Sequence, residues 1–207
     1  MQHSALVVID LQNDITKNYK EIIEKVNTAI DWAVKKNLWV IYIQHNNLSA
    51  GTRTFKPGTR GAELVPEMNV VSEHIFAKTK SNALTSEAFT AFLQEHGITD
   101  FYIAGADAAA CIKSTCYNMA KKGYTVHVLS DCITSYDKRK LPEMLAYRVN
   151  SFRNNGQNKS DQLFTVDRLC SDHSLFLSNQ NMRHKKVFGL SSSIEYFIKS
   201  NFSLLFL

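Results

Sequence analysis

A cysteine at the start of an expected helix is the residue of this sequence best suited to chemistry. The stretch from Ile103 to Ile112 reads as a buried strand ending at Gly105, a turn of small residues, and then Cys111 opening an amphipathic helix. The free N–H groups and positive dipole end of a helix N-terminus lower the pKa of a thiol and stabilise an oxyanion. Cys111 is therefore a candidate nucleophile, although free cysteine is also a common buried core residue.

Two charged residues at the ends of other expected strands are candidate partners for this thiol. Asp10 closes the apolar run Ala5–Ile9, which is typical of a central parallel strand, and Lys78 closes a short run at 74–77. An aspartate that only hydrogen-bonds the next turn and a solvated lysine are the simpler alternatives. Ligands of open parallel sheets bind in a crevice outside the carboxyl ends of the strands, so one such crevice could hold all three residues.

The remaining sequence supplies the elements that must position these residues. Strands are expected at 5–9, 38–43, 74–77, 101–104 and 124–129, with a sixth near 162–166. Helices are expected at about 19–36, after the third and fourth strands, and to about 147, and a long polar loop from His45 to about Ser72 is expected to wall the site. Repeated strand–helix units predict an α/β fold, a three-layer doubly wound sandwich with a mostly parallel five- or six-stranded sheet.

Four patches in this order resemble the isochorismatase-like cysteine hydrolases. They are the Asp-x-Gln-Asn-Asp signature within 5–14, the loop segment 57–64, Lys78 followed by Ala83 and Leu84, and the turn 105–111 with Ile112 and Thr115 behind it. The resemblance covers residues 1 to about 137. This superfamily includes nicotinamidases, N-carbamoylsarcosine amidases, ureidoacrylate and biuret hydrolases, and isochorismatases.

The resemblance implies a catalytic triad and a thioester mechanism. Asp10 would take the thiol proton, Lys78 would lie between the two charges, and Cys111 would attack an amide or ureido carbonyl. It also implies an oxyanion hole made by the backbone N–H groups of Asp107 and Cys111, with a cis bond between Ala106 and Asp107. We expect the substrate to contact four residues: Asn82, Leu84, Ala106 and His45.

Departures from the family pattern bear on the substrate. Nicotinamidases carry an Asp-x-His pair and a second histidine after the second strand, whereas this chain has only His45, followed by Asn46 and Asn47. Asparagine is a poor ligand for zinc or iron, so we expect no metal, no cofactor and a small polar amide in place of nicotinamide. Ala108 stands where many relatives have a threonine. Asp107 brings an acidic side chain near the crevice at the carboxyl ends of the strands.

Three functions remain open at this point. A metal-independent cysteine amidohydrolase acting on a small amide, ureido or carbamoyl C–N bond is favoured, because Cys111 is present together with both of its charged partners. The alternatives are an ether hydrolase of the isochorismatase type, which needs no nucleophilic cysteine, and a catalytically idle binding protein on the same fold.

Composition limits the partners and the compartment. The 207 residues, with a formal charge of +5, show no basic stripe, and the apolar segment 194–207 is too short to span a bilayer, so neither nucleic acid nor membrane is expected as a partner. Four cysteines without framework spacing, and no signal peptide before the first strand, predict a reducing cytoplasm.

We expect a hydrolase domain at 1–150 and an atypical segment at 151–207. This last segment includes the possible strand at 162–166 and then a tail. The end of the tail is expected to be either a docking helix at a subunit interface or a segment altered by a reading-frame change. A homo-oligomer (dimer or tetramer) acting on a small molecule is expected.

Overall fold

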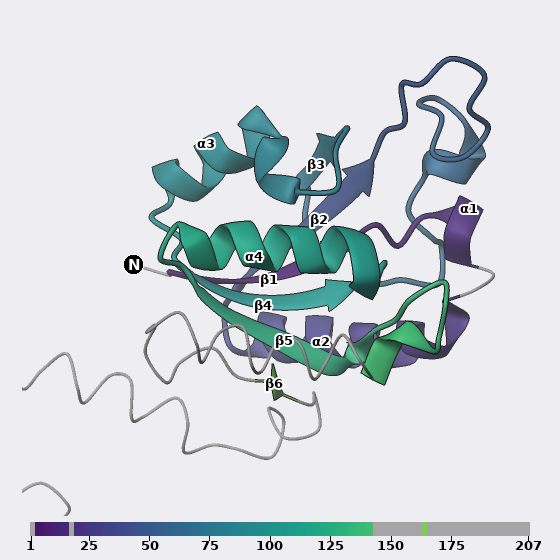
Figure 1. Ribbon diagram of the computed structural model, residues 1–207. Helices are drawn as coiled ribbons and strands as arrows, with labels where there is room; N and C mark the ends of the chain where they lie inside the picture. The colour runs from purple at the N-terminus through teal and green to yellow at the C-terminus, as the bar shows by residue number, and fades with distance from the viewer. Residues whose placement is uncertain (1–2, 17–18, 143–162, 165–207) are drawn as a thin grey trace, which may run out of the picture. The chain divides into compact units, whose positions relative to one another are not determined.

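The computed structural model describes residues 3–16, 19–142 and 163–164 (Figure 1). The chain divides into two compact units, residues 1–170 and 171–207. The second unit lies outside the described residues, as do the expected helix beyond residue 142 and most of the segment 151–207. Everything below concerns the first unit.

A six-stranded sheet in the order β3-β2-β1-β4-β5-β6 forms the centre of this unit. All neighbouring strands are parallel, and β1 lies between β2 and β4. The bounds are β1 Ser4–Ile9, β2 Trp39–His45, β3 Ile75–Lys78, β4 Asp100–Gly105, β5 Thr125–Ile133 and β6 Leu163–Phe164. The parallel α/β class predicted from the strand–helix alternation is therefore confirmed.

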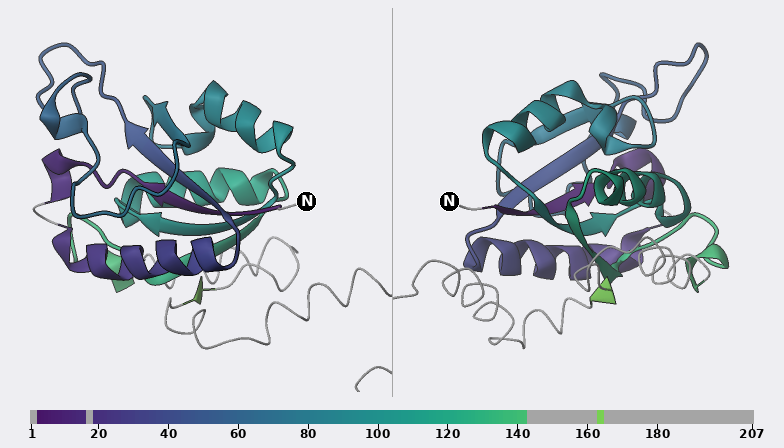
Figure 2. Two further views of the ribbon diagram at one scale, coloured as in Figure 1. Left: turned by 180° about the vertical axis from the view of Figure 1, so that it is seen from behind. Right: turned by 60° about the vertical axis from the view of Figure 1, so that its left-hand side comes forward.

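Helices cover both faces of the sheet, as Figures 1 and 2 show. Helix α2 (Ile23–Lys35) packs on the face that carries Leu6 and Val8, and α3 (Glu87–Glu95) and α4 (Lys113–Lys121) pack on the face that carries Val7 and Ile9. This division follows from the alternation of side chains along a strand. Because both faces are covered, β1 is apolar almost throughout.

Short helical turns connect these elements. They are α1 (Asn13–Thr16), the 3₁₀ turns η1 (Lys20–Ile22), η2 (Arg60–Ala62) and η3 (Ala83–Thr85), and the π-helical turn η4 (Ala108–Ile112). The helix expected at 19–36 is η1 continued by α2. The fourth helix differs more: Cys111 lies inside the π-helical turn, and regular α-helix begins only at Lys113.

The fifth strand also runs further than predicted, to Ile133 instead of 129. Its pairing with β4 changes register between Ile103 and Gly105, so that Ile103 pairs with Val128 but Gly105 pairs with Ile133. A bulge of this kind bends the strand and increases its twist. Neither glycine nor proline lies in the residues 129–132 of β5 that the register change passes over.

Gly105 lets β4 pass close to the end of β1. Its φ of +114° is a conformation that other residues rarely adopt, and a Cβ there would overlap the carbonyl oxygen of Ile9. That same carbonyl accepts a hydrogen bond from the Ala106 N–H at 2.9 Å. The end of β1, where Asp10 follows, is thus fixed directly against the end of β4.

Replacing Gly105 by alanine should be much more destabilising than the same change at Gly123. Gly123 also has a positive φ, +81°, but nothing lies within 4 Å of its would-be Cβ. We expect a loss of about 3 kcal/mol or more for Gly105→Ala and about 1 kcal/mol for Gly123→Ala, measured by urea unfolding. Equal losses for the two variants would show that the contact with Ile9 is unimportant.

Candidate active site

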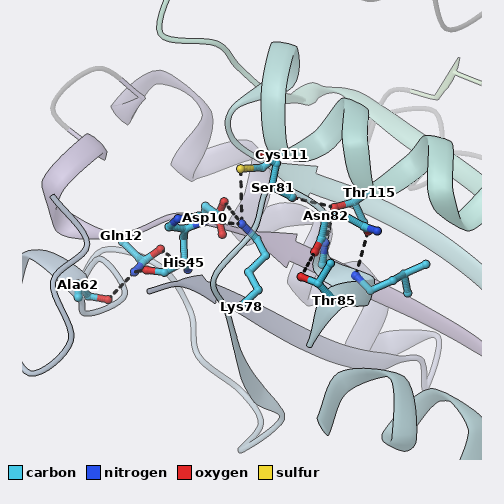
Figure 3. A network of polar contacts seen from close by, with 12 residues as sticks. Asp10, Gln12, His45, Ala62, Lys78, Ser81, Asn82, Thr85, Cys111 and Thr115 are labelled. Carbon is cyan, nitrogen blue, oxygen red and sulfur yellow. Dashed lines mark hydrogen bonds and ion pairs between the residues drawn. The ribbon is translucent and has the colours of Figure 1, made fainter. Parts of the chain in front are cut away.

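The ammonium group of Lys78 lies at the centre of a cluster of polar side chains at the carboxyl ends of the strands (Figure 3). Its Nζ lies 2.7 Å from Asp10 Oδ2 and 3.4 Å from Cys111 Sγ. Asp10 follows β1, Lys78 ends β3, and Cys111 comes from the turn after β4. The structure therefore brings together the three residues that the sequence placed at separate strand ends.

His45, the last residue of β2, completes the surroundings of this ammonium group. Its Nδ1 lies 3.0 Å from Lys78 Nζ and, because an ammonium group can only donate, acts as the acceptor. Burial and the charge of Lys78 lower the pKa of His45 to about 4. The ring is therefore neutral at neutral pH, with its proton on Nε2.

Asp10 is a buried carboxylate that forms an ion pair with Lys78. Its side chain is 3% exposed, and that of Lys78 is fully buried. Burial raises the pKa of Asp10 above its ordinary value, and the attraction of Lys78 opposes this rise. The second oxygen, Oδ1, is also buried and makes no hydrogen bond within the part of the chain that the structure describes. It is free to accept a proton.

The thiol of Cys111 does not have the lowered pKa that its place near a helix N-terminus suggested. Burial and the negative charge of Asp10 raise its pKa to about 12, against the opposing effect of Lys78. The sequence argument counted the helix dipole but not desolvation, which favours the neutral form of an acid. In the resting protein Cys111 therefore keeps its proton.

The turn before Cys111 contains the expected cis peptide bond between Ala106 and Asp107. The Asp107 N–H donates no hydrogen bond to a described residue. The Asp107 carboxylate is fully engaged and so is not an acidic group offered to a substrate. It accepts hydrogen bonds from the hydroxyls of Tyr19 (3.2 Å) and Ser135 (2.5 Å) and from the N–H groups of Ala109 (2.7 Å) and Tyr136 (2.8 Å).

Gln12, the third residue of the signature after β1, fastens the end of β2 and the long loop. It is fully buried, and its amide donates to the carbonyls of His45 at 3.0 Å and Ala62 at 2.7 Å. Its Oε1 accepts from the His45 N–H at 2.8 Å. The side chain thus fixes the backbone of the residue that contacts Lys78.

The two residues that follow hold the loop itself. Asn13 donates to the Arg60 carbonyl at 2.8 Å, and Asp14 accepts from the Phe55 N–H at 2.6 Å. A Cβ on Gly61 would overlap the Asp14 carboxylate, which explains a glycine there. From the sequence, a chemical role was predicted only for Asp10 of this signature, and the structural role of its other polar members was not predicted.

The expected substrate contacts lie in three different settings. His45 contacts Lys78, whereas Ala106 is fully buried. Asn82 is the N-cap of η3 and lies near Lys78 (Figure 3), and its Oδ1 accepts a hydrogen bond from the N–H of Leu84, inside η3, at 3.0 Å. Leu84 itself packs against the core under α3 and α4.

Thr115, one helical turn after Cys111, joins this segment to the helix that follows Cys111. Its side chain is buried, and its hydroxyl accepts from the Ala83 N–H at 3.0 Å. The segment that follows Lys78 is thus held by the helix that follows Cys111.

Comparison with known proteins identifies the family of this chain. The family model described as the isochorismatase domain matches residues 4–153. This chain belongs to the isochorismatase family. A probable inactive nicotinamidase of Arabidopsis thaliana is 27% identical over 181 residues, which cover 75% of this chain and 90% of that protein.

Solved structures of the isochorismatase family share the fold. The N-carbamoylsarcosine amidase of Thermoplasma acidophilum superposes with a TM-score of 0.67 at 18% identity, over 81% of this chain and 98% of that one. An isochorismatase family protein of Desulfovibrio vulgaris gives 0.70 at 18% identity, over 82% and 97%. Among the described residues of this family member, no helix is long and apolar enough to cross a membrane.

Replacing Thr115 by valine should destabilise the protein, because valine keeps the volume but leaves the Ala83 N–H without its acceptor. We expect a loss of about 1–3 kcal/mol in urea unfolding. Thr90→Val is the matched control, since that hydroxyl only donates to carbonyls within and before its own helix. If the two variants lose the same free energy of unfolding, the hydrogen bond from the Ala83 N–H does not contribute to stability.

Alkylation should label Cys111 before the other described cysteines, and slowly at neutral pH. Cys116 and Cys132 are fully buried, whereas Cys111 is half-buried. Because its pKa is raised to about 12, the rate should rise about tenfold per pH unit from pH 7 to 9 without a plateau. Peptide mapping after iodoacetamide treatment measures this and separates Cys170, which lies outside the described residues. A plateau below pH 8 would contradict the raised pKa.

Proposed function

We propose that this isochorismatase-family hydrolase is a metal-independent cysteine amidohydrolase. It would cleave a small non-peptide amide, ureido or carbamoyl C–N bond through a thioester intermediate. The observation that supports this most directly is the position of the Lys78 ammonium group, within contact of both a buried carboxylate and a thiol. This arrangement provides a nucleophile (Cys111), a base (Asp10) and a cation (Lys78). The cation stabilises the negative charge both when it lies on the carboxylate and when it lies on the thiolate.

In the first half of the reaction, Cys111 attacks the carbonyl carbon while its proton passes to Asp10. The high pKa of the thiol makes this transfer part of the attack, and the raised pKa of Asp10 suits it to hold the proton. Lys78 stabilises the negative charge wherever it lies on the two groups. The backbone N–H groups of Asp107 and Cys111 are the proposed donors to the oxyanion.

In the second half, the tetrahedral intermediate breaks its C–N bond. Asp10 returns the proton to the leaving nitrogen, and ammonia or an amine departs. Asp10 then takes a proton from water, whose oxygen attacks the thioester. Collapse releases the acid, or carbamate, and protonates the Cys111 sulfur again.

The substrate would be held by hydrogen bonds and apolar contacts. The proposed contacts are His45, whose Nε2–H is not used by Lys78, the η3 segment with Asn82 and Leu84, and the backbone at Ala106. A neutral histidine and a capped turn offer directional donors and acceptors but no full charge. This favours a small polar amide over an anionic substrate.

An idle binding protein is the second candidate, because the Arabidopsis relative is described as probably inactive. Such a protein would bind a ligand without releasing ammonia. A panel of amides, ureas and carbamoyl compounds, assayed for ammonia release with the native chain and Cys111→Ala, separates the two functions. Ligand binding without turnover would favour the binding protein.

With an active substrate, Asp10→Asn and Lys78→Ala should each lose as much activity as Cys111→Ala, within about tenfold, because residues that act as a unit do not contribute additively. Lys80→Ala is the matched control, since Lys80 is exposed two residues beyond Lys78. Initial rates of ammonia release, with circular dichroism to confirm folding, measure the effect. Near-native turnover in Lys78→Ala would remove the lysine from the mechanism.

A further inference from the structure

Three side chains at the candidate site have the chemistry of a transition-metal site. A carboxylate oxygen of Asp10, a ring nitrogen of His45 and the sulfur of Cys111 all lie within 4.8 Å of one another. An oxygen, nitrogen and sulfur set is typical of zinc and related ions. The neighbours of His45 in the chain do not predict this set, because the other two groups follow different strands.

A second observation shows that this centre has unused binding capacity. Asp10 is 2% exposed, and its Oδ1 is a buried acceptor with no hydrogen-bond partner within the described residues. A buried acceptor without a partner is costly, and a bound cation is one of the groups that can satisfy it. The cluster therefore contains a carboxylate oxygen that is free to bind a metal ion, as well as donor atoms of the types that zinc prefers.

A cation already lies among these groups. Lys78 Nζ is 2.7 Å from Asp10 Oδ2 and 3.0 Å from His45 Nδ1. It is 3.4 Å from the Cys111 sulfur (Figure 3). The side chain of Lys78 is fully buried. One ammonium group thus contacts all three residues of the cluster.

We propose that the ammonium group of Lys78 occupies the place of a metal ion in a latent site for Zn²⁺-like ions, and that it keeps such ions out. A divalent ion among the three groups would lie against the ammonium charge, and this repulsion opposes binding. The lysine thereby protects the thiol from capture by zinc.

Removal of the ammonium group should open the site. Binding of the ion would form a metal–sulfur bond and release the Cys111 proton to solvent. Ligand atoms of tetrahedral zinc are about 3.3–3.8 Å apart, so the cluster needs to contract by about 1 Å. This inference does not depend on the proposed amidase activity, because its readout is metal binding.

The test uses Co²⁺ as a probe with the full-length chain. Lys78→Gln keeps a hydrogen-bond donor beside Asp10, Lys78→Met keeps the length, and Lys80→Gln is the control for loss of a nearby surface charge. We expect the two Lys78 variants to bind one Co²⁺ per chain, at least about 100-fold more tightly than the native protein. The complex should show tetrahedral visible bands and a thiolate-to-cobalt charge-transfer band.

Second substitutions identify the ligands. In the Lys78→Gln background, Cys111→Ser should abolish the charge-transfer band, and His45→Phe should weaken binding about tenfold or more. The native chain and Lys80→Gln should show no band at the same Co²⁺ concentration, and chelators should leave any native activity unchanged.

Three results would overturn the inference. They are a cobalt–thiolate band in the native chain, no metal binding by a folded Lys78 variant, and binding that persists unchanged without His45 and Cys111. The native-chain arm tests the inference even if neither Lys78 variant folds.

Discussion

The constraint on which the site depends is the complete burial of one ammonium group. An amine that has lost its hydration must be surrounded by acceptors, and a charged one also requires an opposite charge nearby. Lys78 meets both requirements with the carboxylate of Asp10, the Nδ1 of His45 and the sulfur of Cys111. These three groups come from the ends of β1, β2 and β4, and Lys78 itself ends β3, so the position of the lysine determines where all of them must lie.

The supporting residues make sense in relation to this constraint. Gln12 holds the backbone of His45, and Asp14 and Asn13 hold the loop beside it, so each polar residue of the signature acts on a neighbour of Lys78 or on the loop. Gly105 brings β4 against β1, which places the turn carrying Cys111 next to Asp10. Thr115 joins the helix behind the thiol to the segment behind the lysine.

The convergence of Asp10, Lys78 and Cys111 was predictable because parallel strands present their carboxyl ends at one edge, and apolar runs mark the ends of strands. Electrostatics was not predictable in the same way. The pKa of the thiol depends on desolvation and on Asp10, both set by packing, and the sequence showed only the helix N-terminus. Likewise, the π-helical turn and the β5 bulge are adjustments of backbone register, which side-chain periodicity does not encode.

The place of β3 at the edge of the sheet has a consequence for how the site opens. This strand has four residues and a single paired neighbour, β2, yet it ends in the buried cation on which the cluster is centred. Edge elements with few partners open locally at a lower free energy than central strands. Fraying of β3 would therefore withdraw the charge from Asp10 and Cys111 while β1 and β4 remain paired, and the polar cluster would come apart before the fold does.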